Sequence, residues 1–310
     1  MADKDLYTPE EVAKTLRISR FTVYELIKRG ELPAYRIGRS MRIEAVELEK
    51  YIQNSKQALT SAAPNSVAHS QDFSAPSGLI LCGQDAVLDV LASQLESRLQ
   101  GNRVFRRFIG SIGSLIALYN QTVNVATAHL WDSDSDEYNI PYVRRYLPGQ
   151  KARIVNLVYR MEGFYVALGN PKGIADWSDL TRPDVRFINR EPGAGARVLL
   201  DEKLRRLNID SSLIKGYNRK EMSHLAVASC VARDDADAGI GTEKAAMQVA
   251  NVQFVPLQKE RYDLVMLRQD VDNPEFKLMM SILRSAEFRR EVDGMGGYDT
   301  SLMGEIVADV

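Results

Sequence analysis

The sequence predicts a multi-domain protein in which a small, mainly α-helical N-terminal domain precedes a larger α/β domain. Three observations support this fold class. Two short helical patterns flank a tight turn near the N-terminus, residues 55–77 contain almost no large apolar side chain, and apolar strand-like runs alternate with helical patterns from residue 78 onward. We therefore expect domains at residues 1–54 and 78–310, joined by a flexible linker at residues 55–77.

The small domain begins with a strong helix start at Thr8-Pro9-Glu10-Glu11. Thr8 can cap the helix, Pro9 suits its first position, and Glu11 closes a capping box. A turn at residues 17–19 leads into a second helix, whose apolar side chains share one face and whose basic side chains share the other. Two short helices joined by a tight turn predict a helix-turn-helix.

A hairpin with basic residues follows the second helix. Residues 33–43 alternate in polarity and turn at residues 38–40, which predicts a β-hairpin wing. Between Lys14 and Arg42 eight cations face only two carboxylates, a local charge of +6 in a chain whose net charge is -1. Such a cluster is the electrostatic signature of binding to DNA phosphates. The alternative is a small interaction module with solvated arginines.

We expect the second helix to enter the major groove of double-stranded DNA and the wing to contact the DNA backbone or the minor groove. The candidate DNA contacts are Arg20, Thr22, Tyr24, Lys28, Arg36, Arg39 and Arg42. The domain resembles the excisionase-like branch of the MerR winged-helix superfamily in the segments Tyr7–Ala13, Ser19–Tyr24, Gly30–Ala34 and Ile37–Arg39. The resemblance implies DNA binding, but the chain lacks the long dimerisation coiled coil of typical MerR regulators.

The larger domain alternates strands and helices, which predicts an α/β fold with mainly parallel strands. Expected strands are residues 78–83, 103–108, 123–126, 153–159, 164–168, 185–188 and 264–267. Expected helices include residues 86–99, 196–207, 223–232, 275–283 and 286–292. Periodicity does not decide between a single sheet and two lobes.

Loops rich in glycine and hydroxyl groups follow several of these strands. Amides at a helix N-terminus form a ready anion site, glycines let an anion approach the backbone, and arginines neutralise its charge. His129 and His224 could donate hydrogen bonds to an anion or be buried polar groups with partners inside the protein. Tyr262 could line the ligand-binding cleft that such loops would form. The candidate ligand residues are Gln84, Asp85, Ser111, Ser114, His129, Arg190, Gly193, Gly195, Arg197, His224 and Tyr262.

The set and order of these loops resemble the periplasmic-binding-protein-like domain of cytoplasmic regulators, related to type II molybdate- and tungstate-binding proteins. The segments that carry the resemblance include Ala128–Asp132, Gly169–Pro171, Asn189–Arg197, Ser223–Ala228, Ala236–Gly241 and Gly297–Ser301. The resemblance implies two α/β lobes joined by a hinge, with a small anion in the cleft. Molybdate or tungstate is the leading ligand, and the two arginines leave room for a larger anionic metabolite.

Other chemistries have weaker support in the sequence. No cysteine–histidine or carboxylate–histidine spacing typical of a metal site occurs, so we expect neither a metal nor a cofactor beyond the bound oxyanion. A triad of Ser111 or Ser114 with His129 and Asp132 lacks the Gly-x-Ser-x-Gly elbow, so we expect no catalytic residues.

The two cysteines are far apart, the N-terminus has no apolar leader, and no stretch approaches a membrane span. These features predict a cytoplasmic, homodimeric transcriptional regulator without membrane contact. The alternatives are an excisionase-like architectural factor of recombination and an enzyme of molybdenum-cofactor metabolism.

Overall fold

In the computed structural model of the chain, the described residues are 6–16, 23, 26, 27, 32–37, 40–51, 78–99 and 103–310. The chain divides into two compact units, Met1–Phe73 and Ser74–Val310. The predicted linker at residues 55–77 and the predicted turn at residues 17–19 lie outside the described residues. No helix in the described part is both long enough and apolar enough to cross a membrane.

The N-terminal unit contains a three-stranded sheet with the order β1-β3-β2. Its named elements are β1 (Leu6–Tyr7), α1 (Pro9–Leu16), β2 (Tyr35–Ile37) and β3 (Ser40–Glu44). β2 and β3 form an antiparallel hairpin in which Ile37 pairs with Ser40, as the alternation at residues 33–43 predicts. Two features were not predicted: β1, which pairs with the far edge of β3, and a helix at residues 45–51.

Local hydrogen bonds fix the start of α1. The Thr8 amide donates to the Glu11 carboxylate at 2.9 Å, and the Glu11 amide donates to Oγ1 of Thr8 at 3.3 Å. The predicted capping box is therefore confirmed. The N-terminal unit has a small apolar core that includes Val12, Ala13, Val23, Leu26, Leu32, Ile43 and Leu48.

The C-terminal unit is built on one mixed sheet with the order β11-β10-β12-β9-β13-β6-β4-β5, and β14 pairs with β9. The strands are β4 (Gly78–Cys82), β5 (Arg103–Arg107), β6 (Val125–Ala128), β9 (Ala152–Ala167), β10 (Phe187–Arg190), β11 (Lys220–Glu221), β12 (Ala238–Thr242), β13 (Val252–Leu267) and β14 (Ile306–Asp309). A separate pair is formed by β7 (Trp131–Asp132) and β8 (Glu137–Tyr138).

The expectation of mainly parallel strands is wrong at the centre of this sheet. β9 and β13 form a long antiparallel pair, and β12, β6 and β14 also run antiparallel to the strands beside them in that pair. The pairs of β4 with β5 and β6, and of β10 with β11 and β12, are parallel. The central strands carry the chain from one group of parallel strands to the other and back.

β9 is one strand where two were predicted. Its ladder with β13 continues through Arg160, Met161 and Glu162, which lie between the two predicted strands. At Gly163 the backbones of β9 and β13 come so close that an added Cβ atom would lie 2.2 Å from the Val255 carbonyl oxygen. The pairing register of the two strands also shifts beside Pro256. Glycine is therefore required at this bend.

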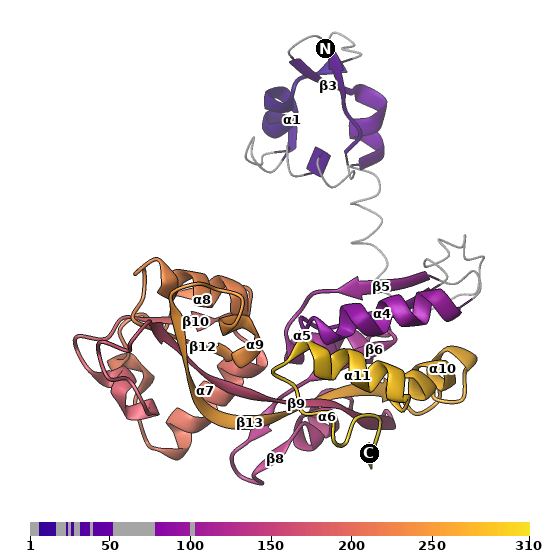
Figure 1. Ribbon diagram of the computed structural model, residues 1–310. Coiled ribbons are helices and arrows are strands. Elements are labelled where there is room, and N and C mark those ends of the chain that lie inside the picture. The colour runs from indigo at the N-terminus through magenta and orange to yellow at the C-terminus, as the bar shows by residue number, and fades with distance from the viewer. Residues whose placement is uncertain are drawn as a thin grey trace. The chain divides into compact units, whose positions relative to one another are not determined.

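Helices pack on each group of parallel strands. In the part we call the first half, α4 (Val87–Arg98), α5 (Ser111–Tyr119), α6 (Ile140–Tyr146), α10 (Pro274–Leu283) and α11 (Ala286–Met295) accompany β4, β5 and β6. In the second half, α7 (Gly195–Arg206), α8 (His224–Ala232), α9 (Glu243–Ala246) and the short 3₁₀ helices Trp177–Thr181 and Ser211–Leu213 accompany β10, β11 and β12. Figure 1 shows β9 and β13 running between the two halves.

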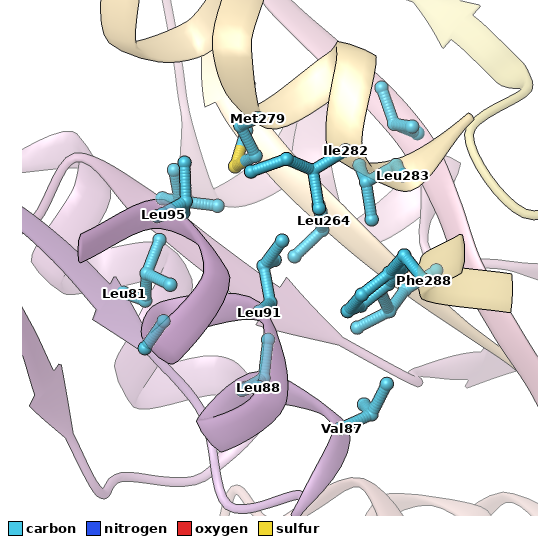
Figure 2. Packing of buried hydrophobic residues seen from close by; sticks show 14 of the residues in the cluster. Leu81, Val87, Leu88, Leu91, Leu95, Leu264, Met279, Ile282, Leu283 and Phe288 are labelled. Carbon is cyan, nitrogen blue, oxygen red and sulfur yellow. The ribbon is translucent and has the colours of Figure 1, made fainter. Parts of the chain in front are cut away.

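Each half has apolar cores of its own. In the first half α4 packs with α10 and α11 through Leu88, Leu91, Met279, Ile282 and Phe288, as Figure 2 shows. Separate clusters surround Trp177 and Leu200, and Val227 and Ile188, in the second half.

Candidate functional site

A cavity lies where the loops of the two halves meet beside the central strands. It encloses about 300 Å³ of empty space, part of which is open to solvent. Its lining residues are Gln84, Ile109, Gly110, Ser111, Thr127, His129, Arg160, Arg190, Ala194, Gly195, His224 and Tyr262. We call this cavity the pocket.

Three helices of eight residues or more begin at the pocket, namely α5, α7 and α8. The amides of Ser111 and Gly195, which occupy the first positions of α5 and α7, donate to no other described residue. Free amides at a helix N-terminus carry partial positive charge and attract anions. The pocket therefore receives such donors from both halves of the domain.

Gly195 is required at the start of α7 because His129 lies against it. A Cβ atom at this position would come within 2.4 to 2.6 Å of the Cε1, Nε2 and Cδ2 atoms of the His129 ring. Next to it, the φ angle of +87° at Gly193 turns the chain so that the Gly193 carbonyl accepts a hydrogen bond from the Ile112 amide at 3.0 Å. That bond joins the two halves at the rim of the pocket.

Two buried arginines reach the pocket. Arg190 donates to both carboxylate oxygens of Glu191 and, at 2.9 Å, to Oε1 of Gln84. Arg160 donates from Nε to Glu260 at 2.5 Å and from Nη1 to Asp85. Among the described residues, neither Nη1 of Arg190 nor Nη2 of Arg160 has a hydrogen-bond partner. Each arginine thus keeps one donor group for a ligand.

His129 and Glu260 form a buried pair below the pocket. Nδ1 of His129 lies 2.7 Å from Oε2 of Glu260. Burial opposes the charged form of Glu260, but the attraction of the His129 ring, which is protonated at the acidic pH where Glu260 titrates, and of Arg160 outweighs burial and lowers the pKa of Glu260 to about 2. Burial also lowers the pKa of His129, against the attraction of Glu260. Glu260 is therefore a carboxylate, and the His129 ring is neutral at neutral pH.

Glu162 lies beside Glu260 and is fully buried. As a carboxylate it would have no donor facing either oxygen among the described residues, whereas the protonated acid can donate a hydrogen bond to Glu260. Burial and the neighbouring charge of Glu260 both raise the pKa of Glu162 well above its ordinary value. An unpaired carboxylate could not remain charged at such a site, so Glu162 is a neutral acid.

His224 lines the pocket from the start of α8. Its Nδ1 atom is buried and has no hydrogen-bond partner among the described residues. Burial, together with the charges of Arg190 and Arg160, lowers its pKa well below the ordinary value. His224 is therefore a neutral ring beside two cations.

His129, Glu162 and Glu260 place one ligand atom each within 4.8 Å of one another, as a metal ion would need. However, both oxygens of Glu260 are already bonded, one to Arg160 and the other to His129. A cation there would also stand next to the Arg160 guanidinium. The arrangement therefore favours a buried ion pair over a metal centre.

The structure brings seven of the predicted ligand residues to the pocket: Gln84, Ser111, His129, Arg190, Gly195, His224 and Tyr262. The other four predicted residues do not line it. Asp85 holds Arg160 and Tyr298, and Ser114 contacts Cys82 at 3.2 Å. Gly193 joins the loops as described above. Arg197 pairs with Asp201 of α7 at 2.9 Å and stacks on the ring of Tyr217.

Arg160 is the charged residue of the pocket that sequence reasoning missed. A signal was present, because Arg160 and Glu162 interrupt an otherwise apolar stretch of β9. Charged residues in a buried strand are rare unless they are paired or functional.

Most of the predicted DNA contacts cannot be placed. Arg20, Thr22, Tyr24, Lys28 and Arg39 lie outside the described residues, as does the side chain of Arg36 in β2. Arg42 follows Met41 in β3, and its Nη1 donates to the Met41 carbonyl at 2.9 Å. Because Ile43 points into the core, the adjacent Arg42 projects from the opposite face of the hairpin.

Comparison with known proteins agrees with this architecture. Residues 6–56 match the model of a helix-turn-helix domain, and residues 92–284 match that of the PBP superfamily domain. The Bacillus subtilis protein YvgK is 40% identical over 312 residues, covering 100% of both chains. A Mycobacterium tuberculosis protein with "DNA-binding protein" in its name is 44% identical over 54 residues, which cover 17% of this chain and 69% of that one.

Solved structures share the fold of the C-terminal unit. A phosphate ABC transporter substrate-binding protein from Clostridium perfringens, with bound phosphate, has a TM-score of 0.55 at 12% identity and covers 72% of this chain and 98% of its own. The sulfate-binding protein SubI from Mycobacterium tuberculosis has a TM-score of 0.52 at 14% identity, with coverage of 72% and 86%. The chain therefore belongs to the PBP superfamily domain family and carries a helix-turn-helix domain at its N-terminus.

Proposed function

We propose that this protein is a ligand-responsive transcriptional regulator that binds double-stranded DNA through its N-terminal domain and a small oxyanion in the pocket. The observation that carries the proposal is the convergence of free helix amides and buried arginines on one cavity, in a chain that also has a helix-turn-helix domain. Molybdate or tungstate is the leading ligand. DNA binding would place the protein in the cytoplasm.

The donors of the pocket suit a compact oxyanion. Ser111, Gly195, Arg160 and Arg190 offer amide, hydroxyl and guanidinium groups from several sides, which matches the oxygens of a tetrahedral anion. Two structural neighbours are named for phosphate and sulfate. Their likeness supports the fold alone, so the anion is proposed from the donors.

We propose that the two halves are lobes and that β9 and β13 form the hinge between them. Contacts between the Ile112 amide and the Gly193 carbonyl, and between Arg190 and Gln84, close the pocket across the halves. An anion that bonds to both α5 and α7 binds only the closed form and therefore stabilises it. In a homodimer, closure would change the spacing of two helix-turn-helix domains, with the β2–β3 hairpin as a wing on the DNA.

We propose that the pocket binds its anion without a serine-based reaction. Oγ of Ser111 accepts a hydrogen bond from the His129 amide at 3.4 Å. No imidazole or carboxylate within the described residues lies within hydrogen-bond distance of that hydroxyl. Ser111 therefore lacks the base that an activated serine needs.

Thermal unfolding of the full chain with molybdate, tungstate, sulfate and phosphate tests the proposed ligand class. A ligand that binds only the folded state raises the free energy of unfolding, and therefore the thermal midpoint. A ligand concentration of about 100 times Kd raises the free energy of unfolding by about 2.7 kcal/mol. We expect a rise with at least one of these anions and no rise when Arg190 is replaced by Met. An unchanged midpoint with all four anions would contradict the proposal.

A further inference from the structure

The proton position on His129 follows from its partner below the pocket. Arg160 and His129 hold Glu260 as a carboxylate, and a carboxylate only accepts hydrogen bonds. Nδ1 of the neutral His129 ring must therefore donate to Glu260. Nε2 is then unprotonated and offers a lone pair, and this edge of the ring lies against Gly195, which lines the pocket.

The fixed charges beneath the pocket do not favour an anion by themselves. Arg160 and Arg190 are bonded to the carboxylates of Asp85, Glu191 and Glu260, which leaves a net charge of minus one while Glu162 is neutral. A dianion that enters this buried site adds further negative charge in a medium of low polarity. One additional proton would lower this electrostatic cost.

We propose that the pocket binds its oxyanion together with one proton, which lies between an anion oxygen and Nε2 of His129. This inference rests on the proposed function and specifies the ligand chemistry. A fully deprotonated anion such as molybdate or sulfate takes the proton from solvent, whereas hydrogen phosphate brings its own. In both complexes one proton forms a hydrogen bond between an oxygen of the anion and Nε2 of His129.

His129 is the suitable site for this proton because it alone of the two pocket histidines contacts a carboxylate. Glu260 bonds to Nδ1 and stabilises the doubly protonated ring, as a carboxylate does for an imidazolium. His224 has no such partner among the described residues, and its ring centroid lies 6.3 Å from that of His129. A second imidazolium at that distance would be repelled by the first and by both arginines.

Every charged or titratable group around His129 enters this balance. Glu260 and Tyr262 face it from β13, Arg160 and Glu162 from β9, Arg190 from β10, and His224 from α8. Tyr262 donates its hydroxyl to Oγ1 of Thr127 at 2.8 Å and meets the ring edge-on, so it supplies no proton. Glu162 is already protonated, which leaves His129 as the group whose charge changes on binding.

Isothermal titration calorimetry of the full chain, in buffers with different ionisation enthalpies, measures the proton count directly. We expect uptake of close to one proton with molybdate or sulfate, and close to zero with phosphate near pH 8, where its dianion already carries a proton. The affinity for molybdate should fall up to about tenfold for each pH unit between about pH 6 and pH 8. The wild-type chain alone therefore tests the inference.

Two variants identify the group that holds the proton. His129→Gln should bind molybdate without proton uptake, and its affinity should not depend on pH. Glu162→Gln is the matched control, because it replaces a buried neutral acid with a neutral amide, and it should keep the uptake of close to one proton.

The possible results separate the two proposals. Tight molybdate binding with no proton uptake and no pH dependence would overturn this inference and leave the proposed function standing. Loss of uptake in Glu162→Gln would overturn the assignment to His129. If molybdate, sulfate and phosphate all fail to bind, the proposed function is wrong and the proton linkage falls with it.

Discussion

The N-terminal domain and the pocket use positive charge in opposite ways. The segment from Lys14 to Arg42 has a local charge of +6. In the pocket, Arg160 and Arg190 are almost fully buried, and each is bonded to carboxylates that cancel its charge. The first region has excess positive charge, whereas the second has fixed donor groups whose arginines are outnumbered by their carboxylate partners.

This difference indicates different partners. Excess charge on a short segment suits an extended polyanion whose counterions are released on binding. Fixed amides and guanidinium groups around a small cavity suit one compact anion, because few groups have to reorganise when it binds. The predictions below test this contrast, beginning with the largest expected effect.

Replacing Arg160 by Met should lower the free energy of unfolding by about 3–5 kcal/mol, because Asp85 and Glu260 would keep buried charges without their cation. Chemical denaturation measures this change. The matched control is Arg205→Met, which removes an exposed arginine paired with Glu202 and should change stability far less, because solvent screens an exposed ion pair. Equal losses in the two variants would show that the buried charges are not held as described.

Replacing Gly195 by Ala should weaken oxyanion binding at least tenfold, about 1.4 kcal/mol, and should destabilise the fold by about 1–3 kcal/mol. The added methyl group would collide with the His129 ring and displace α7 or the ring. Gly294→Ala in α11 is the control, since nothing lies within 4 Å of its added Cβ atom. That variant should gain about 0.5–1 kcal/mol in stability and bind the anion normally. Calorimetry and denaturation distinguish the two outcomes.

Glu162 should make stability depend on pH. Its pKa is raised in the folded chain, so the folded state holds its proton more tightly than the unfolded state does. This contribution is fully present below the unfolded pKa of about 4.3 and is lost as pH rises towards the folded pKa, at about 1.4 kcal/mol per pH unit. Glu162→Gln should lack this loss and be the more stable protein at neutral pH. Identical pH profiles of unfolding would contradict the assignment of a neutral acid.

Replacing Arg42 by Ala should have the smallest effect, because it removes one cation from the outer face of the β2–β3 hairpin. We expect the slope of log DNA affinity against log salt to fall by about one, with little change in sequence preference. Oxyanion affinity of the same variant should not change. An unaltered salt slope would remove Arg42 from the DNA contact surface.

The sequence predicts those features of the structure that are set by residues only a few positions apart, such as the starts of helices. The capping box of Thr8 and Glu11, and the glycine and serine residues at the starts of α5 and α7, all lie within short segments. The i,i+4 spacing of Arg197 and Asp201 also indicates an ion pair within α7, and Arg197 does not line the pocket.

Long-range pairing could not be predicted in the same way. Arg160 finds Asp85 and Glu260 at sequence separations of 75 and 100 residues. Arg160 falls between the predicted strands at residues 153–159 and 164–168 and is absent from the predicted ligand residues. The antiparallel pairing of β9 with β13 likewise depends on segments that only tertiary packing brings together.

The central claim is that an oxyanion in the pocket controls DNA binding by the N-terminal domain. The most direct test measures the affinity of the full chain for a duplex selected from a random-sequence pool, with and without saturating molybdate. We predict a change of at least about fivefold in either direction, and no change in the Arg190→Met variant. Unchanged DNA affinity in a wild-type chain that calorimetry shows to be saturated with molybdate would contradict the claim.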